Sequence, residues 1–467
     1  MGFRGNVYLC IHFIVDLMSL KIFSLSALLL ASGMSATAQN ASAIQANGNT
    51  VQLSLSKAVE IALQHNLNVK SYEVSLRNAQ LQWQQSKNNA LPNLSANVNQ
   101  SSSFGRSINP FTNGYDSRNI NYNNLGLNAG VMVFNGGQIR NTVLQNDYNL
   151  KASQEDLASI KENISLQVVL SYLAILNSED QLSIAKSQTE ITKLQIARTE
   201  KLVNAGSLAP SNLLDLKAQL ANEESNVVSF QSTLDLNKLT LLQLLNDSSI
   251  TAIELQRIQV PTPSSNGYGT GIEDLYAKAL AIQPLVKAAD LRVQSALKGI
   301  SVAKAGSLPT LSLSASMSAN QSNALSMDYF DQINNTQNKV ISLGLNIPIF
   351  SRFAVKTRVA QAGLQRENAS IEASKARLTL RQNIEQAFVN LNNAAKKYEA
   401  GLSQVSALEE SFRAAESRFG AGTIDFVSYN LQKTNLDKAR LSLIQSKYDF
   451  VFRTKILDYY QGKSLVF

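Results

Sequence analysis

Very few side chains in this sequence could act as a nucleophile or as a soft metal ligand. The 467 residues contain one Cys and two His. Cys10 and His12 lie within the first 38 residues, which we expect to be removed after export, so His65 is the one imidazole of the mature chain. A thiolate zinc site, a disulfide scaffold and a Cys nucleophile all require Cys, and the mature chain is expected to have none. A His-based metal site requires more than one His. We therefore predict that the protein holds no metal and no cofactor.

Two short motifs of catalytic proteins occur, and both have simpler structural explanations. Ser54–Lys57 matches S-x-x-K, but it precedes an amphipathic stretch, where Ser serves as a helix N-cap. Gly267–Gly271 matches G-x-G-x-G, but no strand is expected before it and no Lys follows in the Walker position, so it is predicted to belong to a linker. No acid–base pair remains, and we predict that the protein is not an enzyme.

The N-terminal segment has the pattern of an export signal. Ile22–Ala38 is apolar and ends in an A-x-A triplet, which predicts cleavage before Gln39. A suitable positively charged n-region begins at Met18, so we expect translation to start there and residues 1–17 to be an over-called extension. Residues 1–38 are therefore predicted to contain a signal peptide.

Charge and hydropathy narrow the functional classes further. Removal of the signal leaves 40 basic and 33 acidic residues, a net charge of +7. These charges are spread along the chain without a basic cluster, which argues against nucleic-acid binding. No run of 18 or more apolar residues follows the signal, so any membrane crossing is expected to use strands.

The chain repeats itself at a nearly fixed offset. Leu91-Pro92 recurs as Leu308-Pro309 at an offset of 217, and Ala205-Gly206 recurs as Ala421-Gly422 at 216. The same order holds for two further pairs: Ala62-Leu63 with Ala279-Leu280, and Phe134 with Phe350. We predict a tandem duplication with repeats at residues 51–258 and 272–467, joined by a breaker-rich linker at 259–271.

Each predicted repeat has the order helix, strand, strand, long helix, helix. The first helix is expected to run unbroken over 56–88, and the long helices over about 138–203 and 352–418. At 1.5 Å per residue, each long helix would be a rod of roughly 100 Å. Apolar residues recur every seven positions in the last helix of each repeat, as in a coiled-coil seam. The seam residues are Leu213, Leu220, Val227, Leu234 and Leu241, and then Tyr429, Leu436, Leu443, Phe450 and Leu457.

Four segments alternate between apolar and small uncharged polar residues, which is typical of strands in a transmembrane barrel. Their apolar sides, beginning at Leu94, Leu125, Leu311 and Ile341 and including Val133, are predicted to face lipid. The opposite sides are predicted to face a water-filled lumen and include Asn97, Asn128, Ser312 and Ser314. Aromatic residues near the strand ends would form interfacial girdles: Phe104, Tyr122, Phe134, Phe350 and Phe353. A soluble sandwich is the alternative, but its wet face would normally carry Lys, Glu and Arg.

Four strands are too few to close a barrel, because about eight make the smallest packed closure. The barrel is therefore expected to be shared between chains. A homotrimer would supply twelve antiparallel strands.

The order of elements, the Leu-Pro pairs before the strands, the strand exit at Val133–Gly137 and the two helix-turn-helix tips together resemble the TolC-like outer-membrane efflux proteins. The resemblance covers about Leu53–Lys463. It implies an α+β membrane protein built of duplicated helix-strand-strand-helix-helix units. Three chains would form a twelve-stranded barrel in outer-membrane lipid, continuing into a long α-helical barrel in the periplasm.

The resemblance also implies partners and sites. The expected partners are a periplasmic adaptor (membrane fusion protein) and an inner-membrane pump of the RND or ABC type. The helical tips expected to contact the adaptor hold Gly206, Leu208, Gly422 and Ile424. The periplasmic aperture is expected near Asp425 and its rough counterpart Asp215, although the positions that are often acidic in the family hold Ser428 and Leu431.

Three functions remain open from the sequence. The first is the outer-membrane channel of a tripartite efflux system, a passive conduit for small molecules. The second is the outer-membrane conduit of a type I protein-secretion system, which has the same architecture and differs in its inner-membrane partner. The third is a periplasmic coiled-coil scaffold, which would need no alternating strands.

Overall fold

The computed structural model describes residues 50–467 apart from 109–112, 264–267, 270, 464 and 466–467. The predicted signal peptide, with Met18 and the cleavage site before Gln39, lies outside the described residues, as does part of the predicted linker. The chain divides into two compact units. We call them the sheet unit, with Ala79–Asn149 and Val293–Asn368, and the helical unit, with Gln45–Asn78, Leu150–Arg292 and Ala369–Phe467. Each unit takes segments from both predicted repeats, so the units do not coincide with the repeats.

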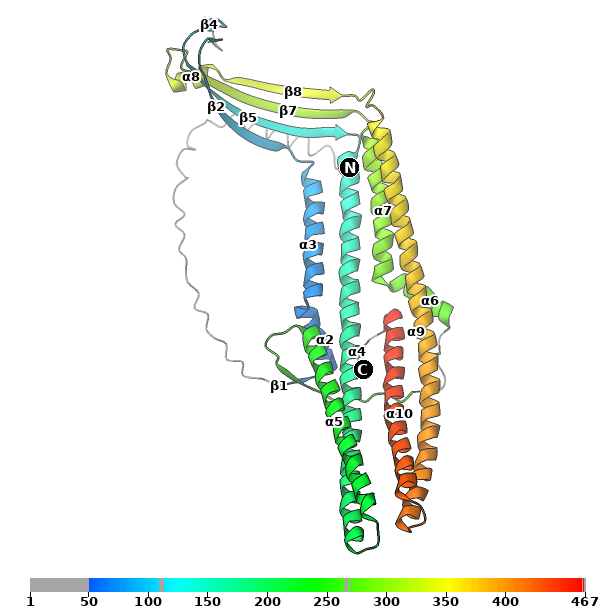
Figure 1. Ribbon diagram of the computed structural model, residues 1–467. Coiled ribbons are helices and arrows are strands. Elements are labelled where there is room, and N and C mark those ends of the chain that lie inside the picture. The colour runs from blue at the N-terminus through cyan, green and yellow to red at the C-terminus, as the bar shows by residue number, and fades with distance from the viewer. Residues whose placement is uncertain (1–49, 109–112, 264–267, 270, 464, 466–467) are drawn as a thin grey trace. The chain divides into compact units, whose positions relative to one another are not determined.

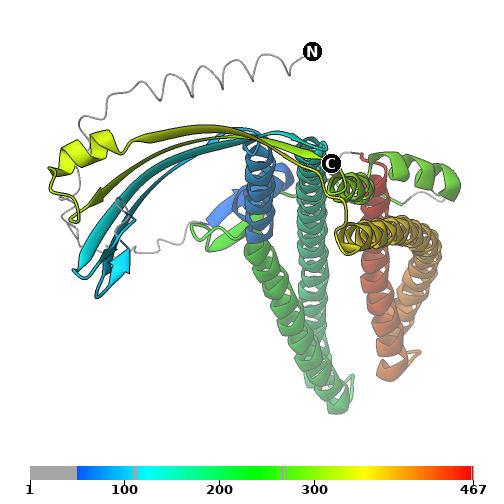
Figure 2. The ribbon, with the colours of Figure 1, turned by 90° about the horizontal axis from the view of Figure 1, so that it is seen from above.

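The sheet unit contains four long antiparallel strands in the order β2-β5-β7-β8 (Figure 1). They are β2 (Asn93–Ser103), β5 (Ile120–Asn135), β7 (Thr310–Ser322) and β8 (Asn338–Asn346). The sheet is curved along its strands (Figure 2). Three short elements were not expected from the sequence, namely β3 (Ser107–Ile108), β4 (Tyr115–Asp116) and α8 (Tyr329–Asn335).

The strand register places the predicted apolar residues on one face of this sheet. Leu94 pairs with Ala129, which pairs with Ala315, which pairs with Ile341. The regular pairing is interrupted at Val133, because the register shifts between Met132 and Phe134 and leaves Val133 as the extra residue of a β-bulge.

The end of β8 also differs from the predicted strand. The alternation of apolar residues that begins at Ile341 continues to Ile349 in the sequence, but β8 ends at Asn346. Pro348 has no backbone N–H and cannot continue the hydrogen-bonded ladder. The residues after Asn346 therefore form the turn that leads into the next helix.

The helices of the two halves of the chain correspond in length and order. The first half has α2 (Leu55–His65), α3 (Leu67–Asn88), α4 (Gln138–Asn204) and α5 (Pro210–Leu245), of 11, 22, 67 and 36 residues. The second half has α6 (Ile272–Ile282), α7 (Pro284–Ala305), α9 (Ala354–Gly420) and α10 (Phe426–Tyr460), of 11, 22, 67 and 35 residues. Within the described part of the chain, no helix combines the length and the apolar character that a membrane span requires.

The helix predicted over 56–88 is in fact two helices, α2 and α3. The Asn66 side chain accepts a hydrogen bond from the backbone N–H of Asn68 (2.9 Å) and donates one to the Leu244 carbonyl (3.0 Å). It thus satisfies a first-turn donor of α3, as an N-cap does. The second half breaks at the matching place, where Gln283 is followed by Pro284 at the start of α7.

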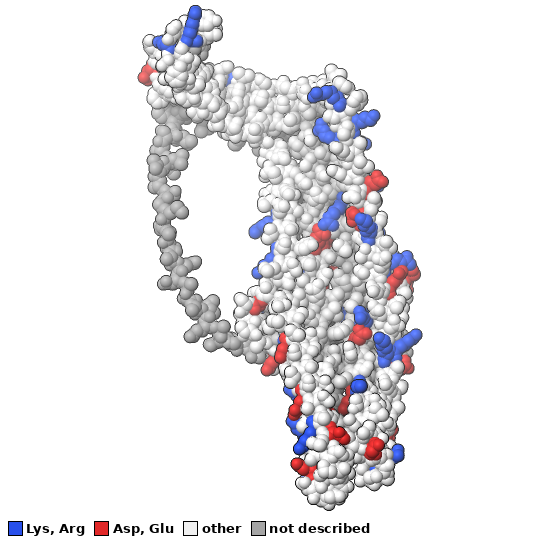
Figure 3. All heavy atoms as spheres, in the orientation of Figure 1, with Lys and Arg blue, Asp and Glu red and all other residues white. Residues whose placement is uncertain are grey.

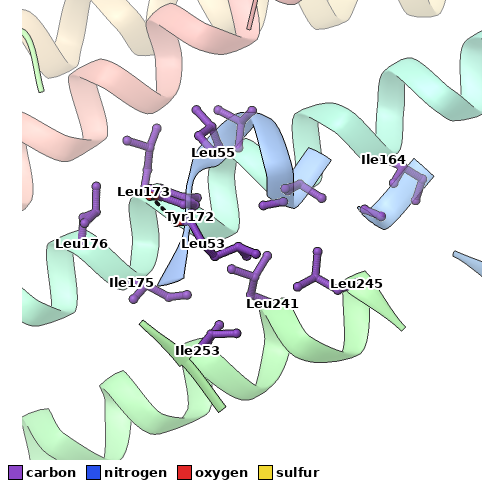
Figure 4. Close-up of a cluster of buried hydrophobic side chains, with 14 of the residues drawn as sticks. Leu53, Leu55, Ile164, Tyr172, Leu173, Ile175, Leu176, Leu241, Leu245 and Ile253 are labelled. Carbon is purple, nitrogen blue, oxygen red and sulfur yellow. Dashed lines mark hydrogen bonds between the residues drawn. The ribbon is translucent and has the colours of Figure 1, made fainter. Parts of the chain in front are cut away.

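The core of the helical unit surrounds a two-stranded parallel sheet that the sequence did not reveal (Figure 4). β1 (Thr50–Leu53) pairs with β6 (Ala252–Leu255). Tyr172 of α4 is fully buried beside them, and its hydroxyl donates to the Gln256 carbonyl oxygen at 2.5 Å, with the Leu53 carbonyl oxygen at 3.1 Å. Burial raises the pKa of Tyr172 to about 12. The uncharged hydroxyl therefore ties α4 to the ends of both strands.

The two strand-to-helix turns of the sheet unit share one unusual backbone. Gly136 and Gly137, between β5 and α4, have φ of +63° and +78°. Arg352 and Phe353, 216 residues later and between β8 and α9, have φ of +50° and +60°. This left-handed region is open to Gly but costs other residues roughly 1 kcal/mol or more each. The second turn therefore keeps two large side chains at positions that favour glycine.

Candidate functional site

The polar face of the sheet is a network of neutral side chains. Asn128 donates from Nδ2 to Oδ1 of Asn97 (3.0 Å), and Asn97 donates in turn to Oδ1 of Asn124 (3.4 Å). Asn124 and the Tyr122 hydroxyl both donate to Oδ1 of Asn320, at 2.7 and 2.6 Å. Tyr122 therefore lies on the polar face and not in an aromatic girdle. This surface can hydrogen-bond to water without presenting a fixed charge.

Glycines opposite the polar side chains make room for them. A Cβ on Gly126 would lie 2.5 Å from Oδ1 of Asn97, its cross-strand partner, and one on Gly344 would lie 3.3 Å from Oγ of Ser312. Ser314 pairs with Gly130 on the same face. The four residues predicted to face the lumen, Asn97, Asn128, Ser312 and Ser314, thus share one face of the sheet.

The other face of the sheet is apolar, and several of its large side chains are exposed among the described residues. Its exposed residues include Leu94, Val98, Ile341, Leu343 and Leu345. The outer edges of β2 and β8 have no strand partner among the described residues. Apolar patches of this kind usually mark contact with a membrane or another protein.

The two helical tips, which join α4 to α5 and α9 to α10, have the same turn. Gly206 and Gly422 have φ of +73° and +72°, and a Cβ on either would meet nothing within 4 Å. The left-handed backbone, and not crowding, therefore favours glycine here. The Ser207 N–H bonds to the Leu202 carbonyl (2.9 Å) and the Thr423 N–H to the Arg418 carbonyl (2.9 Å), which closes both helix ends.

The predicted tip contacts differ in their surroundings. Ile424 is half-buried against an aromatic cluster that includes Phe419, Phe426 and Tyr429, whereas half-buried Leu208 lies outside that cluster. The rings of Phe419 and Tyr429 stack at 4.8 Å. A role of these tips in adaptor binding stays a prediction.

The two predicted aperture carboxylates are not structural counterparts. Asp425 is the N-cap of α10 and accepts from the Ser428 N–H at 2.7 Å, and this hydrogen bond lowers the pKa of Asp425. An offset of 216 leads from Asp425 to Ala209, the N-cap of α5, which makes no side-chain cap bond and precedes Pro210. Asp215 instead lies inside α5 and is exposed. The two carboxylates therefore occupy different positions in their helices, because α5 begins at a proline and α10 after a capping aspartate.

A buried lysine that the sequence did not single out joins three helices near the tips. The Lys433 side chain of α10 is 4% exposed, and its Nζ lies 2.7 Å from Oε1 of Glu223 in α5 and 3.7 Å from Oδ2 of Asp437. Nζ also donates to Oγ1 of Thr192 in α4 at 2.8 Å. Burial raises the pKa of Asp437, although the Lys433 charge opposes that shift. Lys433 therefore links the α4–α5 hairpin to α10.

Comparison with known proteins identifies the family. The sequence profile described as "Outer membrane efflux protein" matches residues 58–247 and 275–453. The chain belongs to the outer membrane efflux protein family. The efflux protein is also similar to outer membrane protein TolC of Escherichia coli (strain K12), with 24% identity over 355 residues that cover 73% of this chain and 70% of that protein.

Solved outer-membrane channels have the same fold. VceC of Vibrio cholerae superposes with a TM-score of 0.75 and 16% identity, covering 88% of this chain and 96% of that chain. CmeC of Campylobacter jejuni superposes with a TM-score of 0.72 and 18% identity, covering 94% and 95%. CmeC is described as an outer membrane channel, and TolC and VceC are described as outer membrane proteins. The efflux protein is accordingly an outer-membrane channel of tripartite efflux, with part of its chain in the periplasm.

Proposed function

We propose that three copies of the efflux protein form a twelve-stranded barrel in the outer membrane. The single observation that carries this proposal is the four-stranded sheet, which has one exposed apolar face, one uncharged polar face and two open edges. Unpaired backbone groups at such edges are costly in hydrocarbon. Pairing of β2 in one chain with β8 in the next would remove every edge.

The polar face of each sheet would line the lumen. Amide, hydroxyl and glycine groups offer hydrogen bonds without the strong binding that a charged ring would give. Such a wall suits a passive conduit for small molecules, whose selection occurs in the inner-membrane pump. A periplasmic adaptor bound at the tips around Gly206 and Gly422 would connect the channel to a pump of the RND or ABC type.

The helical hairpins would control the periplasmic mouth. Lys433 connects α10 with both helices of the first hairpin, so separation of the hairpins requires breaking its contacts with Glu223 and Thr192. We propose that these contacts of Lys433 hold the periplasmic mouth closed. Asp425 lies at the start of the same helix and remains a candidate for the aperture itself.

We also propose that the chain arose by tandem duplication. The family profile matches twice, starting at residues 58 and 275, and the corresponding helices of the two halves start 216 or 217 residues apart. The repeats at 51–258 and 272–467 would then each contribute two strands to the sheet.

The decisive experiment is reconstitution of protein purified from the outer-membrane fraction. We expect a mature N-terminus at Gln39, a heat-sensitive trimer on gels and single-channel conductance in planar bilayers. In cells, deletion of the gene should raise susceptibility to small toxic compounds. A monomer that conducts nothing would contradict the channel, and loss of a secreted protein with unchanged susceptibility would favour the protein-secretion alternative.

A further inference from the structure

Six exposed cations lie near the points where the strands of the sheet join their helices. We define the basic collar as the exposed residues Lys87, Arg140, Lys304, Arg352, Lys356 and Arg358. The four junction segments 86–92, 134–146, 299–309 and 347–362 contain no Asp or Glu. No collar residue forms an ion pair with another described residue. Figure 3 shows Lys and Arg gathered at this end of the sheet, without acidic side chains among them.

Exposed apolar side chains adjoin the collar on its sheet side. Ile349 is 94% exposed, and Phe134, Phe350 and Phe353 are also exposed. Phe350 and Phe353 meet edge to face at 5.7 Å. Aromatic rings next to cations, with an apolar strand face beyond them, are typical of the boundary between hydrocarbon and headgroups.

The backbone strain at the same place is a second, independent observation. Arg352 and Phe353 occupy left-handed positions that Gly136 and Gly137 occupy in the other turn. Glycines would relieve the strain, so the turn alone does not account for the two side chains. Strain that is kept at a site points to a role for the residues that bear it.

We propose that the basic collar binds the phosphate groups of anionic phospholipids in the periplasmic leaflet of the outer membrane. The inference rests on the proposed barrel. Arg352 would hold a headgroup through its guanidinium, which suits phosphate geometry, while Phe353 and Phe350 lie at the edge of the hydrocarbon. Lipid fits better than free phosphate because the cations continue an exposed apolar band. It fits better than a lumen wall because Arg352 is flanked by exposed aromatic rings.

The test compares lipid bound to the wild type and to matched variants. Each protein is reconstituted in vesicles of equal phosphatidylglycerol and phosphatidylcholine and extracted in detergent, and the bound lipids are quantified by mass spectrometry. The triple variant Arg352→Gln, Lys356→Gln and Arg358→Gln removes three collar charges. The control removes three exposed charges far along the chain: Lys186→Gln, Lys396→Gln and Lys397→Gln.

We expect the wild type and the control to retain phosphatidylglycerol preferentially. A cation near an anionic surface contributes about fivefold to lipid binding, so the triple variant should lower the ratio of the two lipids at least about tenfold. Salt should lower the wild-type ratio as well, because it screens these charges.

A second variant separates lipid binding from folding. Arg352→Gly with Phe353→Gly restores the backbone preference of the first turn, so its heat stability should equal or exceed that of the wild type. Its phosphatidylglycerol ratio should nevertheless fall. An unchanged ratio in this variant would show that the side chains serve the turn and would overturn the proposal.

The remaining outcomes are also distinct. If the wild type neither trimerises nor conducts in any vesicle, the channel proposal fails and the collar proposal fails with it. If it conducts and the triple variant keeps the wild-type lipid ratio, the collar proposal alone is overturned. A change in the ion selectivity of the triple variant without a change in bound lipid would place these cations in the lumen and would also overturn it.

Discussion

At the scale of single residues, Lys433 shows how a charge can hold helices together from the inside. Its ammonium is almost fully enclosed, with Glu223 and Asp437 facing it. Burying these groups is costly, and the cost is offset only while opposite charges remain together. Lys433 lies four positions after the seam residue Tyr429 and so on the same helix face. Its partners Glu223 and Thr192 are 210 and 241 residues away in the sequence, so no local pattern predicts these contacts.

Replacement of this lysine should weaken the closed helical unit. In Lys433→Met, two mostly buried carboxylates lose their cation, and we expect a loss of about 3 kcal/mol or more in the free energy of unfolding. Helix loss on heating, followed by circular dichroism, measures the effect, and bilayer recordings should show more frequent opening. Lys438→Met, at an exposed position of the same helix, is the control. Equal melting of both variants would contradict the link.

Asp425 predicts a dependence on pH. Its pKa is lowered in the folded chain, so its contribution to stability is present above the unfolded value of 3.8 and is lost as pH falls through the folded value. Asp425→Ala should therefore melt at a lower temperature than the wild type at neutral pH, and the difference should narrow as the pH falls through the folded value. Asp425→Asn keeps an N-cap acceptor but cannot ionise, so its melting temperature should lie between those of Asp425→Ala and the wild type at neutral pH and approach that of the wild type in acid. A gap between wild type and Asp425→Ala that is independent of pH would contradict this account.

At the scale of elements, long periodic segments were predictable and local exceptions were not. The helix expected over 138–203 runs over Gln138–Asn204, and no seam residue is exposed. The break at Asn66 depends on a side-chain contact with Leu244, 178 residues away, which no local pattern contains. β1 and β6 have four residues each, too few for alternation to be recognised.

For the candidate site, the sequence predicted which face most strand residues lie on, but not the local exceptions. Alternation alone placed Asn97, Asn128, Ser312 and Ser314 on one face, because side chains in a strand point to the two sides in turn. It did not predict the bulge at Val133, after which Phe134 pairs with Leu311 of the apolar face. At Tyr122 alternation predicted the polar face correctly, and the aromatic-girdle expectation differed because the ring ends in a hydroxyl that joins the polar network.

The two faces of β7 should respond differently to charge. Leu313 pairs with Leu343 on the apolar face, and its neighbour Ser314 pairs with Ser342 on the polar face. Leu313→Lys should cost about 2 to 4 kcal/mol per chain if it lies near the middle of the bilayer, whereas Ser314→Lys should be nearly neutral. The heat stability of the trimer on gels gives the comparison. Equal tolerance of both substitutions would mean that the strands do not span a membrane.

At the scale of the whole molecule, the sheet order makes the proposed trimer testable by disulfides. β2 and β8 are opposite edges of one sheet, three strand spacings or roughly 14 Å apart. A disulfide requires Cα atoms within about 7 Å, so one between these strands can form only between chains. The mature chain is predicted to have no Cys, so any disulfide that forms would involve only the introduced Cys residues.

We expect Asn97→Cys, combined in turn with Val340→Cys, Ser342→Cys or Gly344→Cys, to give covalent trimers on oxidation in at least one register. Non-reducing gels show the products. Asn97→Cys with Gly126→Cys is the control, because these residues face each other within one chain. Cross-linked dimers without trimers, or no product at any position, would argue against a closed ring of three.

The matched lengths of α4 and α9 set a limit on how such a protein can vary. Each has 67 residues, or roughly 100 Å at the rise of an α-helix. If α4 or α9 alone were shortened, the two tips would no longer be level. The seam residues of α5 or α10, whichever follows the shortened helix, would no longer match the residues that they pack against. A shorter or longer channel therefore requires the same whole number of heptads to be removed or added in all four helices of the two hairpins. The width of the periplasm that this protein can serve would then change in steps of about 10 Å.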